Sequence, residues 1–251
     1  MKTSIRIALI VCLGLIGHGF AQDELLVQAN VEVESQHLWR GQLINDDWVI
    51  QPGASASYGK LSGGMVASIG LTDYHGRQYE VERADFYAAW TEPLEGIPGV
   101  TYSVGLMYYD YVRVDQESSE IFGRLSFDLP FSPSIACYYE TDDADGAYLS
   151  LGARKSYGNV AEWGLGYPIG LDLTAQLGWG TSDYNAYHWG VHEAQFNDFD
   201  LSAAMPFQAY GFAVTPMVGF VGLLGADVKD SHRYSPDSSY VYLGVRVARA
   251  F

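Results

Sequence analysis

The chain has 251 residues, of which 48% are hydrophobic and only 18% are charged, and its net charge is −16. Soluble domains usually carry about a quarter charged residues, whereas here 28 Gly and 19 Tyr dilute the apolar residues. This length suits one β domain, and the acid excess argues against a nucleic-acid partner, which would need a basic face. The composition fits a barrel whose outer surface faces lipid.

The first 21 residues have the pattern of a cleavable secretion signal. Two basic residues precede a short apolar run, and Gly19–Ala21 forms a small-x-small cleavage site. The apolar run is too short for a membrane-spanning helix, which needs about 20 residues. We therefore expect a signal peptide over 1–21 and an outer-membrane barrel over 22–251.

Cysteine content limits the chemistry of the mature chain. Cleavage would remove Cys12 together with Lys2 and Arg6, which leaves Cys137 alone and changes the net charge from −16 to −18. A single cysteine can form neither an intramolecular disulfide nor a cysteine-based metal site. We expect no metal and no cofactor.

Apolar and polar residues alternate with period 2 along most of the chain, as they do in strands with two different faces. In the first such segment Val27, Ala29 and Val31 alternate with Gln28 and Asn30. Nine segments show the alternation strongly, namely 27–34, 65–71, 83–90, 102–108, 120–128, 147–153, 173–179, 199–205 and 241–247.

Three weaker candidates complete the set, at 48–58, 134–140 and 212–220. Together they predict twelve strands, an even number as bacterial single-chain barrels require. The count is least secure over 155–170, which could hide another short strand.

The connections are expected to differ between the two ends of the barrel. Periplasmic turns are usually short and outer loops longer. The expected periplasmic links carry Gly or Pro and are short except for one, and they are 59–63, 92–99, 129–133, 155–170 and 206–210. The expected outer loops include 39–47, 182–195 and 224–238.

A soluble β-sandwich would show the same alternation with its apolar face inward, so other features must decide. Aromatic residues near the expected strand ends favour interfacial girdles. These residues are Trp39, Trp48, Trp90, Tyr108, Tyr109, Tyr111 and Trp179. The chain also ends on a strand with Phe251, which resembles an outer-membrane assembly signal, although Arg249 departs from it. We predict an all-β fold, a single closed antiparallel transmembrane β-barrel of about 12 strands.

Charged residues recur on the polar faces and are expected to line the lumen. The set comprises Glu32, Glu34, Arg40, Arg83, Asp85, Glu120, Arg124, Asp128, Arg154, Asp198, Asp200 and Arg246. Barrel closure would bring Arg246 close to Glu32 or Glu34. The set could form a charged constriction that selects solutes, or ion pairs that fill a narrow lumen, and sequence favours neither. Because acids outnumber bases, an open pore should mildly prefer cations.

No motif indicates catalysis, so we expect no enzyme activity. Ser35 and His37 share one face, but a lipase would need more than this pair, and no Gly-x-Ser-x-Gly elbow occurs. His188 and His192 lack the pattern of a zinc site. The acidic stretch 142–145 suits a hairpin turn better than a calcium loop.

The chain resembles the TorF-type porins, an outer-membrane family. The resemblance rests on 35–41 (SQHLWRG), 58–71, 81–90 (VERADFYAAW) and 101–111 (TYSVGLMYYDY), and its most specific part is Trp39-Arg40-Gly41. It covers the first half of the chain well and is looser after Tyr111. The resemblance implies a monomeric-type barrel with a transport role and supplies no substrate.

The leading hypothesis is a passive channel in the cell outer membrane for small hydrophilic solutes. Its expected partners are outer-membrane lipid, the barrel-assembly machinery and those solutes, with no nucleic acid. The alternatives are a closed structural or adhesive barrel with acidic loops and, less favoured, an outer-membrane lipase.

Overall fold

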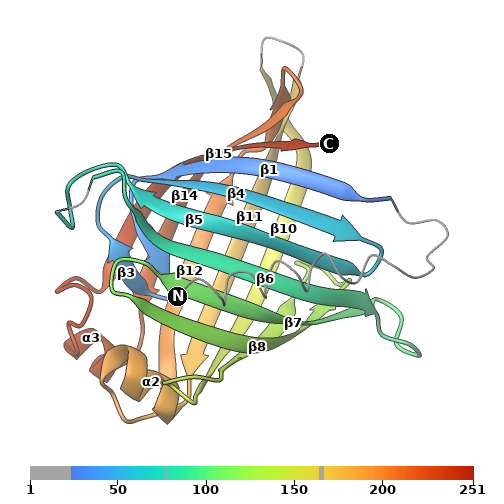
Figure 1. The fold of residues 1–251 in the computed structure, drawn as a ribbon. Helices are drawn as coiled ribbons and strands as arrows, with labels where there is room; N and C mark the ends of the chain where they lie inside the picture. Colours follow the sequence, from blue (N-terminus) through green and yellow to red (C-terminus); the bar gives the residue numbers. More distant parts are fainter. Residues whose placement is uncertain (1–23, 77, 164–166) are drawn as a thin grey trace.

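A computed structural model describes residues 24–76, 78–163 and 167–251, so the expected signal peptide over 1–21 lies outside the described residues. Twelve antiparallel strands form a closed barrel, and a thirteenth, β13 (Phe207–Ala209), pairs with one of them (Figure 1). The barrel strands are β1 (Leu26–Glu34), β4 (Val49–Tyr58), β5 (Leu61–Gly70), β6 (Val81–Pro93), β7 (Val100–Tyr111), β8 (Gln116–Phe127), β9 (Ser134–Glu140), β10 (Ala147–Trp163), β11 (Tyr167–Gly180), β12 (Gln195–Ala204), β14 (Phe212–Leu223) and β15 (Ser239–Ala250).

The barrel closes because its first and last strands pair with each other. Val31 on β1 lies opposite Val247 on β15 and, on its other side, opposite Pro52 on β4. Closure gives every barrel strand two neighbours, so the wall has no open edge, as lipid requires. The predicted twelve-strand barrel is confirmed.

The uncertain segment 155–170 adds no further strand in its described part. β10 runs to Trp163 and β11 begins at Tyr167, so the expected long link is a ribbon of two lengthened strands. Their register shifts between Tyr157 and Ala161. The additional strand, β13, instead forms in the link expected over 206–210.

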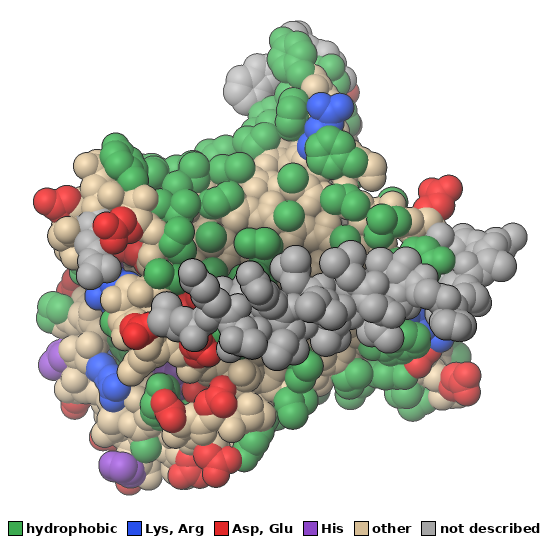
Figure 2. All heavy atoms as spheres, in the orientation of Figure 1, with side chains coloured by type: hydrophobic (Ala, Val, Ile, Leu, Met, Phe, Trp, Pro, Cys, Tyr) green, Lys and Arg blue, Asp and Glu red, His purple; other side chains and the backbone are tan. Residues whose placement is uncertain are grey.

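The two faces of the wall follow the predicted alternation. Leu106, Ile121 and Val241 are 59%, 54% and 62% exposed on the outside, whereas Arg83 and Glu120 are each only 1% exposed inside. Apolar side chains also spread over the outer face of the visible wall (Figure 2). A soluble sandwich would bury these apolar residues in a dry centre, so the predicted inside-out arrangement of a lipid-facing barrel is confirmed.

The barrel ends differ, as expected. We call one the turn end, which carries the short links 59–60, 94–99 and 128–133. The other, the loop end, carries long structured segments with α2 (Ser182–Trp189) and α3 (Ala226–Asp230), and acidic side chains gather there (Figures 1 and 2). Within the described ranges, neither helix has the length and apolar character needed to span a bilayer.

Part of the expected aromatic girdle is wrong. Trp48 and Trp90 are exposed on the outside, 45% and 38%, as predicted. Trp39, Tyr109 and Tyr111 instead lie inside the barrel, packed around the guanidinium of an interior arginine. The physical reason is that Trp39 belongs to a segment that folds inward.

Candidate functional site

Residues 37–45, which overlap the outer loop expected over 39–47, form a hairpin of β2 (His37–Trp39) and β3 (Gln42–Asn45). Its two turn residues, Arg40 and Gly41, both have positive φ, 49° and 78°. Two such residues in sequence make the turn that best matches the twist of paired strands. Glycine adopts this conformation freely, but arginine does so at a cost, so the contacts of Arg40 must compensate.

This inner hairpin, residues 37–45, lies within the barrel because it contacts walls on several sides. Arg40 at its tip binds Glu120 on β8. A Cβ atom added to Gly41 would lie 2.8 Å from the Cβ of Asp198 on β12, so the hairpin backbone touches that wall. Leu43 packs against buried residues of β14 and β15. The expectation of an outer loop over 39–47 is therefore wrong, because this segment turns into the lumen.

The tip of the inner hairpin is held by a bidentate ion pair. Arg40 donates from Nη1 and Nη2 to the two carboxylate oxygens of Glu120, at 2.6 and 2.8 Å, and the Tyr109 hydroxyl donates to the same carboxylate at 2.8 Å. The guanidinium lies 4.5 and 4.6 Å from the ring centroids of Tyr138 and Tyr148. A planar cation between rings gains a further attraction that an ammonium group would not match.

A second buried cation, Arg83 on β6, supports the base of the hairpin. Its Nε donates to Asp85 at 2.6 Å, and its guanidinium lies 4.4 Å from the ring of Trp39. Its two Nη groups have no protein partner in the part of the chain that the structure describes. A cavity of about 20 Å³ adjoins them and is also lined by His37, which leaves room for one water molecule.

His37 joins the hairpin to β5 through a 3.0 Å hydrogen bond with the Ser68 hydroxyl. Burial, and then the nearby positive charge of Arg83, lower the pKa of His37 to about 3, so its imidazole is neutral near pH 7. The hydroxyl of Ser35, the other residue considered for a lipase, accepts the N–H of Leu243 at 2.9 Å.

Helix α2 lies at the loop end (Figure 1) and contacts the hairpin, since the ring centroids of His188 and Trp39 are 5.8 Å apart. It begins after the N-cap Thr181, whose side chain accepts the N–H of Tyr184. His188 on this helix contacts the carboxylate of Glu140 at 2.9 Å, and burial lowers the pKa of His188. Tyr184 is fully buried against Tyr148 on the barrel wall, with 5.5 Å between ring centroids. The loop half of the lumen is therefore a packed layer of polar and aromatic groups.

The turn half of the lumen is open to water by comparison. Arg246 binds Glu32 at 2.5 Å, which confirms the predicted pairing across the closure, yet the arginine side chain is 51% exposed. Arg124 is exposed as well. At the mouth, Arg154 binds Asp172 at 2.6 Å and is 60% exposed. We call this turn half the vestibule and assign to it Glu32, Glu34, Arg124, Asp200 and Arg246. Arg124 and Arg246 are exposed, Glu34 and Asp200 are partly buried, and Glu32, the partner of Arg246, is only 6% exposed.

The predicted lumen residues thus fall into three groups. Five lie at the level of the inner hairpin, namely Arg40, Arg83, Asp85, Glu120 and Asp198. Five line the vestibule, as defined above. Arg154 and Asp128 lie at the turn-end mouth, with Asp128 one residue beyond β8.

Sequence reasoning missed several residues that complete the packed layer. His37, Glu140, Tyr148, Tyr184 and His188 are buried there. The usable signal was a two-residue turn containing Gly between short alternating segments, which favours a hairpin.

No family model and no curated protein matches the chain. Among solved structures, it is similar to the KdgM porin, with 12% identity over 89% of this chain and 99% of that chain and a TM-score of 0.49. The NanC porin gives 10% identity, 90% and 98% coverage and a TM-score of 0.44. The COG4313 outer membrane channel from Pseudomonas putida F1 gives 11%, 94% and 98%, and 0.41. Likeness at this level carries no argument about substrate or activity.

Proposed function

We propose that the protein is a porin-like channel of the outer membrane, through which small hydrophilic solutes pass and in which the inner hairpin forms the constriction. One observation carries the proposal: a charged lumen, open over the vestibule, is closed at the loop half by a single hairpin whose tip is held by the Arg40–Glu120 ion pair. A barrel of twelve strands has a lumen between that of a filled 8-stranded barrel and that of an aqueous 16-stranded porin.

The chemistry of the hairpin contacts supports a movable constriction. An apolar hairpin in this position would be stabilised by burial alone. Arg40, Glu120 and His37 can instead each replace a protein partner with water when the hairpin moves away from the wall. The expected cost of separation lies mainly in breaking one buried ion pair. A hairpin held in this way suits a channel that opens and closes.

The vestibule supports the proposed mild cation preference. Asp200 adds a carboxylate beside the mutually compensating Glu32–Arg246 pair. Rings of carboxylates are a common means of selecting cations in pores.

The second candidate is a closed structural barrel, and the packing of the loop half favours it. Tyr184 and Asp198 are 0% and 1% exposed, and α2 lies over the hairpin. In this case the charged groups would act as fillers, and no solute would pass.

The resemblance to TorF-type porins belongs to the same proposal. Its most specific residues, Trp39-Arg40-Gly41, lie at the tip of the inner hairpin, which gives the motif a physical role in the lumen. Phe251 directly follows β15, with its N–H bonded to the carbonyl of Val27, a position that suits an assembly signal at a terminal strand.

Single-channel recording in planar bilayers tests this function. We expect discrete conductance steps from the folded protein. A disulfide between His37→Cys and Ser68→Cys, made in a Cys137→Ser background, should suppress the steps when oxidised and restore them when reduced, because these two side chains join hairpin and wall. The Cys137→Ser protein alone is the control.

Heat-modifiable migration on a gel should accompany each recording to show that the barrel is folded. A folded protein that stays silent in both redox states would overturn the channel and support the closed barrel. Steps that are unchanged by the cross-link would show that the inner hairpin is not the constriction.

A further inference from the structure

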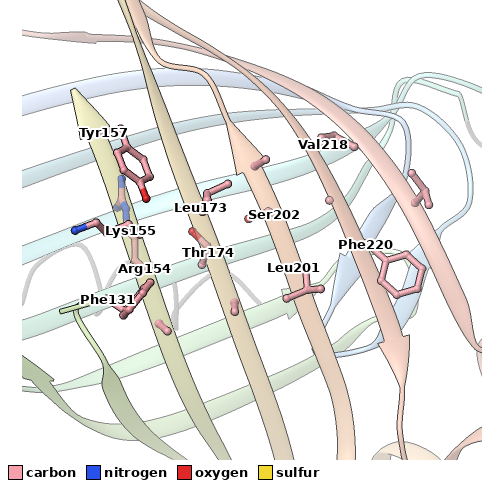
Figure 3. Close-up of a pocket in the computed structure, with 15 residues that line it drawn as sticks. Phe131, Arg154, Lys155, Tyr157, Leu173, Thr174, Leu201, Ser202, Val218 and Phe220 are labelled. Atoms are coloured by element: carbon pink, nitrogen blue, oxygen red, sulfur yellow. The ribbon is translucent and has the colours of Figure 1, made fainter. Parts of the chain in front are cut away.

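The outer wall carries a groove that the channel function does not use. Its volume is about 620 Å³, within the usual range for small-molecule sites, and it runs across β10, β11, β12 and β14 on the side that faces lipid (Figure 3). Exposed apolar side chains line most of it, among them Leu173, Leu201 and Val218. A convex barrel wall would ordinarily present ridges of side chains here rather than a hollow.

The hollow exists because small residues form its floor and large ones its rim. Ala153 on β10 lies directly opposite Ala175 on β11, and Ala203 on β12 continues the floor. Tyr157 and Phe131 rise on one side, the latter from the turn after β8, and Phe220 of β14 stands on the other (Figure 3). The result is a trough open to the hydrocarbon phase.

The two basic residues at the turn-end side of this groove lie on opposite faces of β10. Lys155 is on the outer face, where β10 has passed beyond its last pair with β9, Gly152 with Ser134. Arg154 is on the lumen face, where it is paired with Asp172 at the mouth.

Lys155 is the more unusual of the two. It is exposed, its ammonium lies 5.8 Å from the ring centroid of Tyr157, and among residues 24–76, 78–163 and 167–251 it forms no ion pair. An unpaired cation beside an apolar trough, on a chain with a net charge of −16, is complementary to an anionic headgroup attached to an acyl chain.

We propose that this groove binds one phospholipid of the turn-end leaflet, with an acyl chain in the trough and the phosphate against Lys155. The inference rests on the proposed function in that the wall must face a membrane. The side chains at the rim would contact the bound acyl chain from both sides, and this distinguishes the bound lipid from the fluid lipid around the rest of the wall. An anionic glycerophospholipid fits better than a zwitterionic one, because the ammonium of a zwitterionic headgroup compensates its own phosphate, whereas an anionic headgroup keeps a net negative charge for Lys155.

Native mass spectrometry of the purified folded protein in mild detergent tests the proposal, with added phosphatidylglycerol or phosphatidylcholine as the probe. We expect one phosphatidylglycerol to remain bound preferentially. Lys155→Gln should weaken retention about fivefold, the usual contribution of one basic residue near an anionic lipid. Ala175→Leu, which fills the floor without a charge change, should abolish it.

Lys60→Gln is the matched control. Lys60 is a half-exposed turn-end lysine on another part of the wall, where it contacts Glu92 and the ring of Trp90, so its loss should leave retention unchanged. Equal retention by the Ala175→Leu protein and the original chain would overturn the lipid site. So would equal retention of the two lipids, which would indicate ordinary annular binding.

The outcomes separate this site from the proposed function. If the protein retains phosphatidylglycerol in the groove but never conducts, only the proposed channel function is contradicted. If it conducts normally and retains no lipid, only the proposed lipid site is contradicted.

Discussion

The two halves of the lumen contain the same kinds of residue in different states. In the loop half, Arg83 and Glu120 are each 1% exposed and are packed against aromatic rings. In the vestibule, Arg246 is 51% exposed although it too has a carboxylate partner. The strands supply charge to both halves, and the inner hairpin together with α2 buries the charges of the loop half. A charged strand face therefore does not show whether a barrel is filled or open.

The largest effect is expected from breaking the tip of the inner hairpin. Arg40→Ala would leave the buried Glu120 carboxylate without its cation, at a cost of about 3–5 kcal/mol to the seated state. Channel open probability in bilayer recordings should rise strongly. Arg124→Ala removes the same charge from the vestibule, where the arginine is exposed, and should leave gating unchanged. Equal effects of the two variants would contradict the difference between the halves.

A second comparison sets the outer face against the inner one. Leu106→Arg places a charge on the exposed apolar face near the middle of β7, and should lower the free energy of unfolding from lipid vesicles by about 2–4 kcal/mol. Ser55→Arg, on the lumen face of β4, should cost much less because its charge stays in water. Urea titration of vesicle-inserted protein measures both. A Leu106→Arg protein as stable as Ser55→Arg would mean that β7 does not face lipid.

Acid should loosen the loop half but not the vestibule. His37 has a pKa of about 3 when seated and about 6.5 when free in water, so the unseated hairpin binds more protons. Neutral His37 stabilises the packed position of the inner hairpin fully above pH 6.5, and this stabilisation is lost progressively as the pH falls below that value. Between pH 7.5 and pH 5, the free energy that holds the hairpin in place should fall by about 2 kcal/mol.

Recordings at the two pH values should therefore show more frequent openings at pH 5. His188, whose pKa burial also lowers, acts with the same sign. His37→Gln keeps a polar partner for Ser68 and cannot be protonated, so its response to acid should be smaller. A wild-type channel that closes at pH 5 would refute the expected sign.

The smallest effect concerns selectivity in the vestibule. Asp200→Asn removes one of its carboxylates and should shift the reversal potential in a salt gradient slightly towards anions. Asp230→Asn, at the exposed end of α3 on the loop end, makes the same change outside the lumen and should have no effect. A shift of the opposite sign for Asp200→Asn would remove the proposed cation preference.

The strands could be predicted from sequence because the difference between the two faces imposes a period of two residues over seven or more positions. Even the weak segment 134–140 forms a strand where expected. The inner hairpin could not be placed, because three and four residues per strand are too few for the alternation to show which way they face. Trp39 was assigned to the girdle for the same reason. Helix α2 does have local signals in Thr181 and Gly190 at its two ends, but its seat on the hairpin depends on residues far away in the chain.

Cysteine reactivity along β8 tests the central claim most directly, because this strand passes through all three environments. In a Cys137→Ser background, Ser126→Cys faces the vestibule, Ser118→Cys the packed layer, where serine is 5% exposed, and Ile121→Cys the outer face. With folded protein in vesicles, a water-soluble thiol reagent should label position 126 rapidly and positions 118 and 121 slowly, and a lipid-soluble quencher should reach only a probe at 121. Equal labelling of 118 and 126, or rapid labelling of 121 from water, would contradict a lipid-facing barrel that is filled at one half and open at the other.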